Sequence, residues 1–371
     1  MSQRVYYLDG MRGLLILSIV LIHTLQVYNP DQTWLIYSDT GIAWAPYLIE
    51  LLMLFTLPSF FMMSGYLAAM SIGKQGTAHF FESRLKRIVV PIISAAVILN
   101  SLQTYLLVKS GWMHFALLDY LKEGKWISHL WFLIDLAVFF SLIYIAVKYF
   151  SRYLQRFDHV LQKYIARTNI YLVLTMIAGL TVVFLALFSL FAPYLNNPIL
   201  NIRSLAFYLP FFLFGILMYR YRSLYEKMLG LSLFSLILVT VFSYYSALYL
   251  AGYEGKAYRF LYYFFDTVAH LFASVLCFVL FYRFMNRRTQ WMRILSDASY
   301  TIYLFHHLFV IAFGLLFIKF GIDGYLALPL LFLSASGLSL FVHQRLISQI
   351  PWLAFLFNGK KRVEAKERRD V

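Results

Sequence analysis

Arg12 and His23 are a cation and an imidazole near the start of the chain, with ten mostly apolar residues between them. On a helix, eleven steps of about 100° bring both side chains to one face, about 16 Å apart along the axis. A neutral imidazole can take a proton from a hydroxyl as a general base. Ionisable groups in an apolar span usually face an interior cavity. We therefore take both as candidate catalytic residues, against the alternative of a buried histidine with a structural role.

Four further residues stand in or beside apolar segments. Asp135 lies about a third of the way into such a segment and is the third catalytic candidate. Asp9, three residues before Arg12, shares its helical face; it is either half of an interfacial charge pair or a substrate contact. Trp131 is either a substrate contact or an interfacial aromatic anchor. Glu50 is a substrate candidate nearer the end of its segment.

Three cations, Arg84, Lys86 and Arg87, precede another apolar segment. Arg84 and Arg87 share a helical face and can hold a polyanion through forked hydrogen bonds. The alternative is a cluster that only sets membrane topology. Ser64, beside Gly65, either lets a ligand approach the backbone or forms a small-residue helix contact, which packing favours.

The remaining candidates are histidines. His306 and His307 are adjacent and therefore point about 100° apart on a helix, which predicts that only one faces a given cavity. Asp266 and His270 are four residues apart and can pair. Cys277 is the only cysteine, so the chain has no intramolecular disulfide. Because the histidines lack a ligand spacing, we predict no metal site.

The elements that must position these residues are membrane helices. Of the 371 residues, 61% are hydrophobic and 13% charged, and the mean hydropathy is +0.71. Separate apolar stretches of about 20 residues indicate an all-α, polytopic membrane helical bundle. The ten predicted spans are 8–28, 46–72, 88–108, 129–150, 170–192, 204–220, 229–251, 260–283, 298–318 and 324–347.

Charge placement orients this bundle. With an even number of spans, most of the 32 basic residues fall on the side that holds both termini, which the positive-inside rule assigns to the cytoplasm. The net charge of +15 is therefore a membrane-topology signal and does not indicate nucleic-acid binding. We expect a membrane domain over residues 1–358 and a basic cytoplasmic tail over 359–371. The first segment has no small-residue cleavage site and is expected to remain as a span.

An ordered set of short motifs resembles a known family. Residues 8–13 and the Arg12–His23 pair match the first-span signature of the acyltransferase 3 family of integral membrane O-acyltransferases. Residues 61–66, 84–87 and 299–306 match its second-span, cytoplasmic and late motifs. Stretches at 127–133, 207–212 and 350–360 resemble the branch that succinylates periplasmic glucans.

The resemblance implies an enzyme of the bacterial inner membrane, with acyl-CoA as cytoplasmic donor, a periplasmic glucan as acceptor, and no permanently bound cofactor. Arg84 and Arg87, with Lys86 and Ser64, would bind the donor, and His23 would deprotonate the sugar hydroxyl. Arg12 would orient the donor or stabilise negative charge. Arg12, His306 or His307 would meet a succinyl carboxylate; the sequence does not choose among them.

Three alternatives remain open from the residues. The acyl group passes either directly to the acceptor or through an acyl-histidine, which would give ping-pong kinetics. The enzyme alternative is an O-acetyltransferase of another envelope glycan or glycolipid. The alternative of another class is a membrane transporter, which also keeps ionisable groups in its spans.

Overall fold

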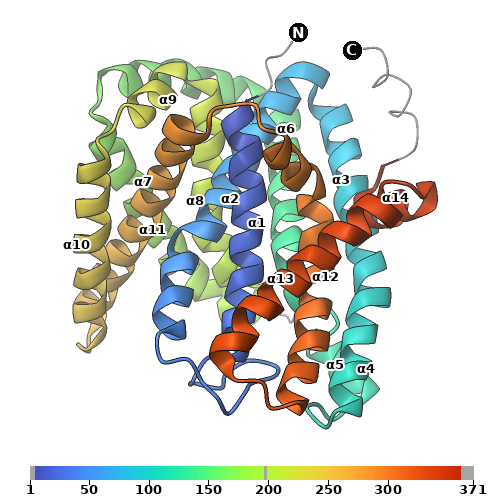
Figure 1. The fold of residues 1–371 in the computed structure, drawn as a ribbon. Coiled ribbons are helices and arrows are strands. Elements are labelled where there is room, and N and C mark those ends of the chain that lie inside the picture. The colour runs from blue at the N-terminus through green and yellow to red at the C-terminus, as the bar shows by residue number, and fades with distance from the viewer. Residues whose placement is uncertain (1–4, 196–198, 361–371) are drawn as a thin grey trace. The chain divides into compact units, whose positions relative to one another are not determined.

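The computed structural model describes residues 5–195 and 199–360, and in that part of the chain every regular element is a helix (Figure 1). The predicted basic tail lies outside these residues except for Gly359 and Lys360. The α-helices are α1 (Tyr6–Val27), α2 (Ala45–Gln75), α3 (Thr77–Ser94), α4 (Ser101–Lys109), α5 (Leu117–Lys122), α6 (Trp131–Arg167), α7 (Ile170–Leu195), α8 (Ile202–Arg220), α9 (Arg222–Leu229), α10 (Leu233–Ala251), α11 (Lys256–Met285), α12 (Gln290–Lys319), α13 (Gly324–Val342) and α14 (Pro351–Asn358). Short π- and 3-10 helices occupy Ala95–Asn100, Ser128–Leu130 and His343–Ile347.

Ten helical segments of the described chain are long and apolar enough to cross a membrane, and each coincides with one predicted span. The all-α, polytopic bundle is thereby confirmed. Two segments show features that the sequence did not predict. The third span, Thr77–Lys109, contains the π-helix Ala95–Asn100. In α6, the backbone leaves the helical range at Phe150, where the predicted span ends, and a second helical stretch follows to Arg167.

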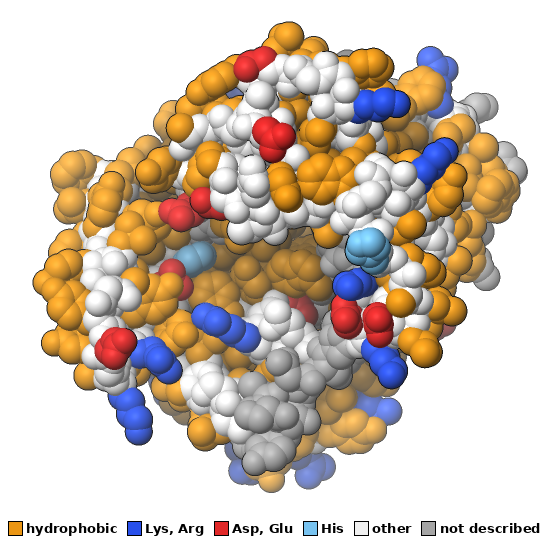
Figure 2. Space-filling model, turned by 90° about the horizontal axis from the view of Figure 1, so that it is seen from below, with side chains coloured by type: hydrophobic (Ala, Val, Ile, Leu, Met, Phe, Trp, Pro, Cys, Tyr) orange, Lys and Arg blue, Asp and Glu red, His pale blue; other side chains and the backbone are white. Residues whose placement is uncertain are grey.

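Large apolar side chains are exposed along most spans, as expected of helices that face lipid. In α10, only 17% of the apolar 18-residue stretch that could span the membrane is buried inside the protein. Figure 2 shows one face of the molecule, where hydrophobic side chains cover most of the surface and charged ones are scattered among them.

The chain divides into two compact units. Unit 1 comprises Met1–Met11, Leu54–Glu82 and Val138–Arg287, and unit 2 comprises Arg12–Met53, Ser83–Ala137 and Arg288–Val371. The division runs through α1, α2, α3 and α6, so each unit is assembled from segments far apart in sequence.

Unit 1 is held together by close helix crossings. Helices α10 and α11 lie side by side, and α7 packs on α8 and α11 (Figure 1). Where α2 crosses α8, a Cβ on Gly65 would lie 1.9 Å from the Phe212 carbonyl oxygen, and one on Gly215 would lie 1.9 Å from that of Met62. Only glycine allows this backbone approach. Gly65, the neighbour of Ser64, is therefore part of a small-residue helix contact.

Unit 2 is built around α12, which packs on α4, α13, α14 and both π-helices. The π-helix Ala95–Asn100 widens one turn of the third span, as π-bulges do. At its end, the buried Asn100 Nδ2 donates to the carbonyls of Trp126 (2.8 Å) and Ile127 (3.1 Å). This side chain ties the span to the segment that leads into α6.

Candidate active site

His23 lies in the last two turns of α1, and the residue as a whole is of intermediate exposure. Its Nδ1 lies 3.0 Å from Gln26 Oε1, three residues further along the same helical face. Because a carbonyl oxygen can only accept, His23 donates from Nδ1 and its Nε2 carries the free lone pair. The helix thus supplies both the imidazole and the amide that fixes its tautomer.

Three further imidazoles surround His23 within unit 2. Ring-centroid distances from His23 are 5.3 Å to His306 and 4.9 Å to His307. His129, from the 3-10 turn before α6, stacks on His307 at 4.7 Å and lies 5.3 Å from His306. We call His23, His129, His306 and His307 the histidine cluster. Three separate segments of the chain build it.

His306 and His307 both belong to this cluster, since their rings lie 4.7–5.3 Å from those of His23 and His129. The prediction that only one of the two faces a given cavity stays a prediction. His307 Nδ1 donates to Gln103 Oε1 at 2.7 Å. His306 Nδ1 donates to the carbonyls of Tyr303 (2.7 Å) and Ile302 (3.0 Å), and its buried Nε2 has no hydrogen-bond partner among the described residues.

The loop between α1 and α2 covers His23 with an aromatic ring. Trp34 stacks on His23 at 5.6 Å and meets His307 edge-on at 5.3 Å. The loop is pinned to the end of α1, since Ser38 N donates to the Val27 carbonyl and Ile42 N to that of Tyr28, each at 2.8 Å. Trp34 is therefore held by backbone hydrogen bonds.

Burial distinguishes His23 from its neighbours. His129, His306 and His307 are 7%, 0% and 3% exposed, whereas His23 retains partial exposure. His23 is therefore the least enclosed residue of the cluster.

Asp135 lies beside this cluster as part of its surroundings. It is buried in the first turns of α6 and interacts electrostatically with Tyr303. The Tyr303 hydroxyl in turn donates to the His129 carbonyl. The predicted catalytic role of Asp135 stays a prediction.

A group of arginines forms a second polar region of unit 2. Arg84 interacts electrostatically with both Arg87 and Arg12, although Arg12 lies more than 70 residues earlier in the sequence. On an ideal helix, Arg12 is about 16 Å from His23 along the axis of α1. Three guanidinium groups gathered from two helices are a composition that suits the binding of a polyanion.

The backbone beneath Arg87 is fixed by two other segments. Tyr300, on α12, donates its hydroxyl to the Arg87 carbonyl at 3.0 Å. Gly359 caps α14 with a φ of +59°, and a Cβ there would lie 2.5 Å from Arg87 Cα. Asn358 Oδ1 accepts from Thr301 Oγ1 at 3.5 Å. The end of α14 thus packs directly against residues 86–87 of α3, which we call the arginine segment.

The other predicted site residues are more dispersed. Trp131 is in unit 2 at the start of α6, and Lys86 and Glu50 are exposed there, on α3 and α2. Ser64 and Asp9 belong to unit 1. Among the described residues, no group of three or more histidine, cysteine or acidic side chains is arranged to hold a metal ion.

Comparison with known proteins places this arrangement in a family. A family model described as an acyltransferase domain matches residues 5–343, nearly the whole chain. The chain belongs to the acyltransferase 3 family. It is therefore a multi-pass membrane acyltransferase. No solved structure matches it.

The acyltransferase is also similar to curated proteins over most of its length. "Glucans biosynthesis protein C" of Escherichia coli O1:K1 / APEC is 26% identical over 97% of this chain and 95% of its own. The protein of the same name from Escherichia coli strain K12 is 25% identical over the same shares.

Several residues of the acyltransferase site were missed by sequence reasoning. His129, Trp34, Gln26 and Gln103 were not predicted as site residues, although all contact the histidine cluster. His129 had a usable signal, because it is an imidazole at the start of an apolar segment. Gln26 had one too, three residues after His23. Trp34 and Gln103 carried no signal that separates them from ordinary loop and helix residues.

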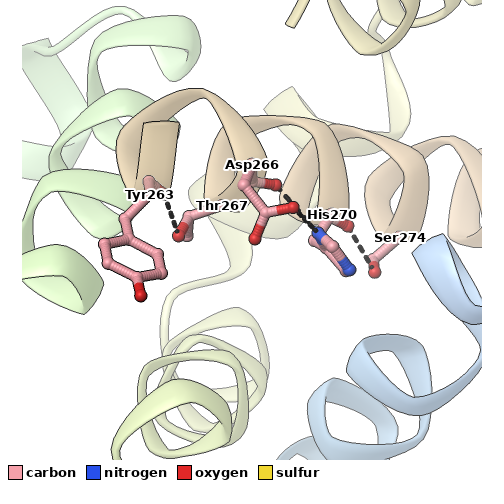
Figure 3. Close-up of polar contacts among 5 residues, drawn as sticks. All are labelled: Tyr263, Asp266, Thr267, His270 and Ser274. Carbon is pink, nitrogen blue, oxygen red and sulfur yellow. Dashed lines mark hydrogen bonds and ion pairs between the residues drawn. The ribbon is translucent and has the colours of Figure 1, made fainter. Parts of the chain in front are cut away.

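The Asp266 and His270 pair forms instead in unit 1 of the acyltransferase, on α11 (Figure 3). His270 Nδ1 donates to the Asp266 carbonyl at 2.8 Å and lies 3.6 Å from Asp266 Oδ1. Thr267 and Ser274 also return hydrogen bonds to carbonyls of their own helix. This ladder satisfies polar groups locally and is separate from the histidine cluster in sequence and unit.

Proposed function

We propose that this acyltransferase moves an acyl group from cytoplasmic acyl-CoA to a hydroxyl of a periplasmic glucan, with His23 as the general base. The histidine cluster carries this proposal. His23 is the partly exposed member, its Nδ1 is anchored on Gln26, and its Nε2 is available to accept a proton. A base needs that geometry: the right tautomer, held in place, within reach of a substrate.

The arginine group supports a CoA donor. Arg12, Arg84 and Arg87 interact electrostatically, so their mutual repulsion is relieved when a polyanion binds. Guanidinium groups hold phosphates bidentately. The packing of Tyr300 and Gly359 on Arg87 gives this end of the site a fixed backbone.

The reaction then balances within these residues. The acceptor hydroxyl gives its proton to His23 Nε2 as its oxygen attacks the thioester carbonyl carbon. A carbon–oxygen bond forms and the carbon–sulfur bond breaks. The leaving thiolate takes the proton back from His23, which returns to its starting state. General-base assistance of this kind contributes about 10²- to 10⁴-fold to the rate.

The choice of succinyl and glucan rests on similarity and on charge. The name of the similar Escherichia coli proteins refers to glucan biosynthesis. A succinyl group carries a carboxylate into the site, and Arg12 or an imidazole of the cluster can offset that charge by a charge-assisted hydrogen bond. We place the enzyme in the bacterial inner membrane, where both substrates are within reach.

The decisive experiment uses the full chain reconstituted in vesicles. Succinyl-CoA or acetyl-CoA is supplied with gluco-oligosaccharides of several linkages, and acylated products are detected by mass spectrometry. We expect a mass increase of one succinyl group for wild type and none for His23→Ala. His79→Ala, at an exposed histidine outside the cluster, is the matched control. Acetyl transfer alone would change the donor, and full activity of His23→Ala would overturn the base assignment.

A further inference from the structure

Helix α6 changes direction at Phe150, where φ is −117° and ψ is 17°, values outside the helical range. The upright part crosses the membrane, and residues 151–167 follow as a second helical stretch. In Figure 1 this green stretch runs across the upper ends of α7 and α8. All of these elements belong to unit 1. We call residues 151–167 the crossing segment.

One face of the crossing segment is fixed to unit 1. Asp158 Oδ1 accepts from Arg220 Nε at 2.7 Å and from the Tyr221 hydroxyl, and Ile165 is 2% exposed. At its C-terminal end, Lys227 Nζ donates to the carbonyls of Ile165, Ala166 and Thr168 at 2.8–3.1 Å. A lysine at this end satisfies orphan carbonyls and complements the helix dipole.

A second face of the crossing segment is apolar and exposed. Tyr153, Val160 and Tyr164 are 69%, 66% and 42% exposed. At 100° per residue they fall within about 40° of one another, so they form one stripe. Exposed apolar stripes on a helix indicate a partner that removes them from water.

A third face carries positive charge. Arg152, Arg156 and Lys163 are exposed and also fall within about 40° of one another, directly beside the apolar stripe. No ion pair found in the described chain involves these three. Asp158, the acid of this segment, points to the fixed face, where Arg220 neutralises it.

We propose that the crossing segment is an interfacial helix that binds anionic lipids of the bilayer in which the protein sits. A helix with adjacent apolar and cationic stripes lies in the plane of a membrane surface, with its apolar stripe at the acyl boundary and its cations at the headgroups. A soluble polyanion would satisfy the cations but leave Tyr153, Val160 and Tyr164 in water. Because the segment crosses the ends of α7 and α8, it lies at one end of these spans, where the headgroups of a bilayer are expected (Figure 1).

The first test measures lipid preference of the full chain. Detergent-solubilised protein is titrated with phosphatidylglycerol or phosphatidylcholine, and bound lipids are counted by native mass spectrometry. We expect preferential retention of phosphatidylglycerol, and a loss of about tenfold or more in its affinity for R152Q/R156Q/K163Q. The matched control, K109Q/K122Q/K256Q, removes three exposed lysines elsewhere and should keep wild-type affinity. Equal retention of both lipids, or an unchanged triple variant, would overturn the proposal.

A second test does not depend on the stability of a triple variant. Spin labels are placed at Val160→Cys and, as a comparison, His159→Cys, each in a Cys277→Ala background, in vesicles containing phosphatidylglycerol. We expect the label at 160 to be accessible to oxygen and the label at 159 to a water-soluble nickel reagent. Water accessibility at both positions contradicts the proposal. Displacement of phosphatidylglycerol by equimolar inorganic triphosphate would assign the cations to a soluble polyanion and also contradict it.

Discussion

His23 in unit 2 and His270 in unit 1 are both histidines on apolar helices, and each anchors Nδ1 on its own helix. His23 does so on Gln26 Oε1, and His270 on the Asp266 carbonyl. Their surroundings differ. His23 adjoins two other imidazoles and Trp34, whereas the aromatic contact of His270 in the described chain is with Phe207, at 5.3 Å.

The difference shows what a site requires beyond one able residue. An anchored Nδ1 fixes the tautomer in both places. At His23, three segments from distant parts of the chain converge. Arg12, which interacts with Arg84, lies on the same helix as His23. At His270, the polar side chains of α11 form hydrogen bonds with backbone carbonyls of the same helix (Figure 3). Convergence of elements, more than the presence of an imidazole, separates the candidate site from a local polar patch.

Alanine at each histidine gives the sharpest contrast. We expect His23→Ala to lower acyl transfer by about 10²-fold or more, because the general base is lost. His270→Ala should keep activity within about twofold. Initial rates of the purified variants, measured by product mass, provide the comparison. Similar losses in the two variants would mean that the two histidines are not functionally distinct.

The arginines extend the comparison to the donor. Arg84→Ala with Arg87→Ala should weaken CoA binding by about tenfold or more, because each removes a charge-assisted hydrogen bond worth about 1.5–3 kcal/mol. Arg203→Ala, in unit 1, should leave donor affinity unchanged; Arg203 lies over the Tyr263 ring. Isothermal titration with a non-hydrolysable acyl-CoA measures both. If the double variant bound the donor as tightly as wild type, Arg84 and Arg87 would serve only to set membrane topology.

Gln103→Leu tests whether the cluster depends on its anchors. It removes the acceptor of His307 Nδ1–H, and a buried donor left without its partner costs about 1–3 kcal/mol. We expect a fall in kcat with little change in donor KM. The control is Ser274→Ala, which removes a hydroxyl bonded only within α11. A Gln103→Leu enzyme as fast as Ser274→Ala would show that His307 needs no orientation.

Alanine substitutions at two glycines, one in each unit, test how closely the backbone is packed there. Gly359→Ala should lower stability by about 1–3 kcal/mol, because its φ is positive and the new Cβ would collide with Arg87. Gly179→Ala, in α7, meets no atom within 4 Å and should be neutral or slightly stabilising. Thermal unfolding in one detergent measures both. A stable Gly359→Ala protein would mean that α14 is not closely packed on the arginine segment.

The smallest effect is expected at Asp158 in unit 1. The hydrogen bond from Arg220 holds the pKa of the Asp158 carboxyl below its usual value. Its stabilisation is therefore present above the unfolded pKa of about 4 and is lost as pH falls through the lower folded pKa. Because the pair is partly exposed, Asp158→Asn should cost about 0.5 kcal/mol at pH 7. The difference from wild type should disappear in unfolding scans near pH 2; a constant difference would refute the ion-pair explanation.

Sequence reasoning gave the ten spans because each is long, apolar and bounded by charges. It also gave Arg12 and His23, since one helix carries both and helical geometry relates them. It missed the partnership of His129 and Gln103 with the histidines of α12, which depends on how helices are rotated against one another. In apolar spans, hydrophobic residues face all directions, so their pattern does not fix that rotation.

The crossing segment was missed for a different reason. Its charges identify a surface region, and counting charges is enough to place it outside the span. Whether it is a loop or a helix depends on the contacts that Arg220 of α8 and Lys227 of α9 make with it, which no local pattern specifies. The arginine group was anticipated in part: Arg84 and Arg87 were paired, but the approach of Arg12 was not.

The π-helix Ala95–Asn100 has a consequence for how this span can change in evolution. A π-bulge contains one residue more than the α-helix it interrupts, so it shifts the phase of everything that follows by about 100°. Gln103 stands just after the bulge and reaches His307 in that phase. Deletion of a single residue there would leave the span as hydrophobic as before while turning Gln103 away from its partner. An insertion or deletion in this span can therefore impair its function without changing its hydropathy.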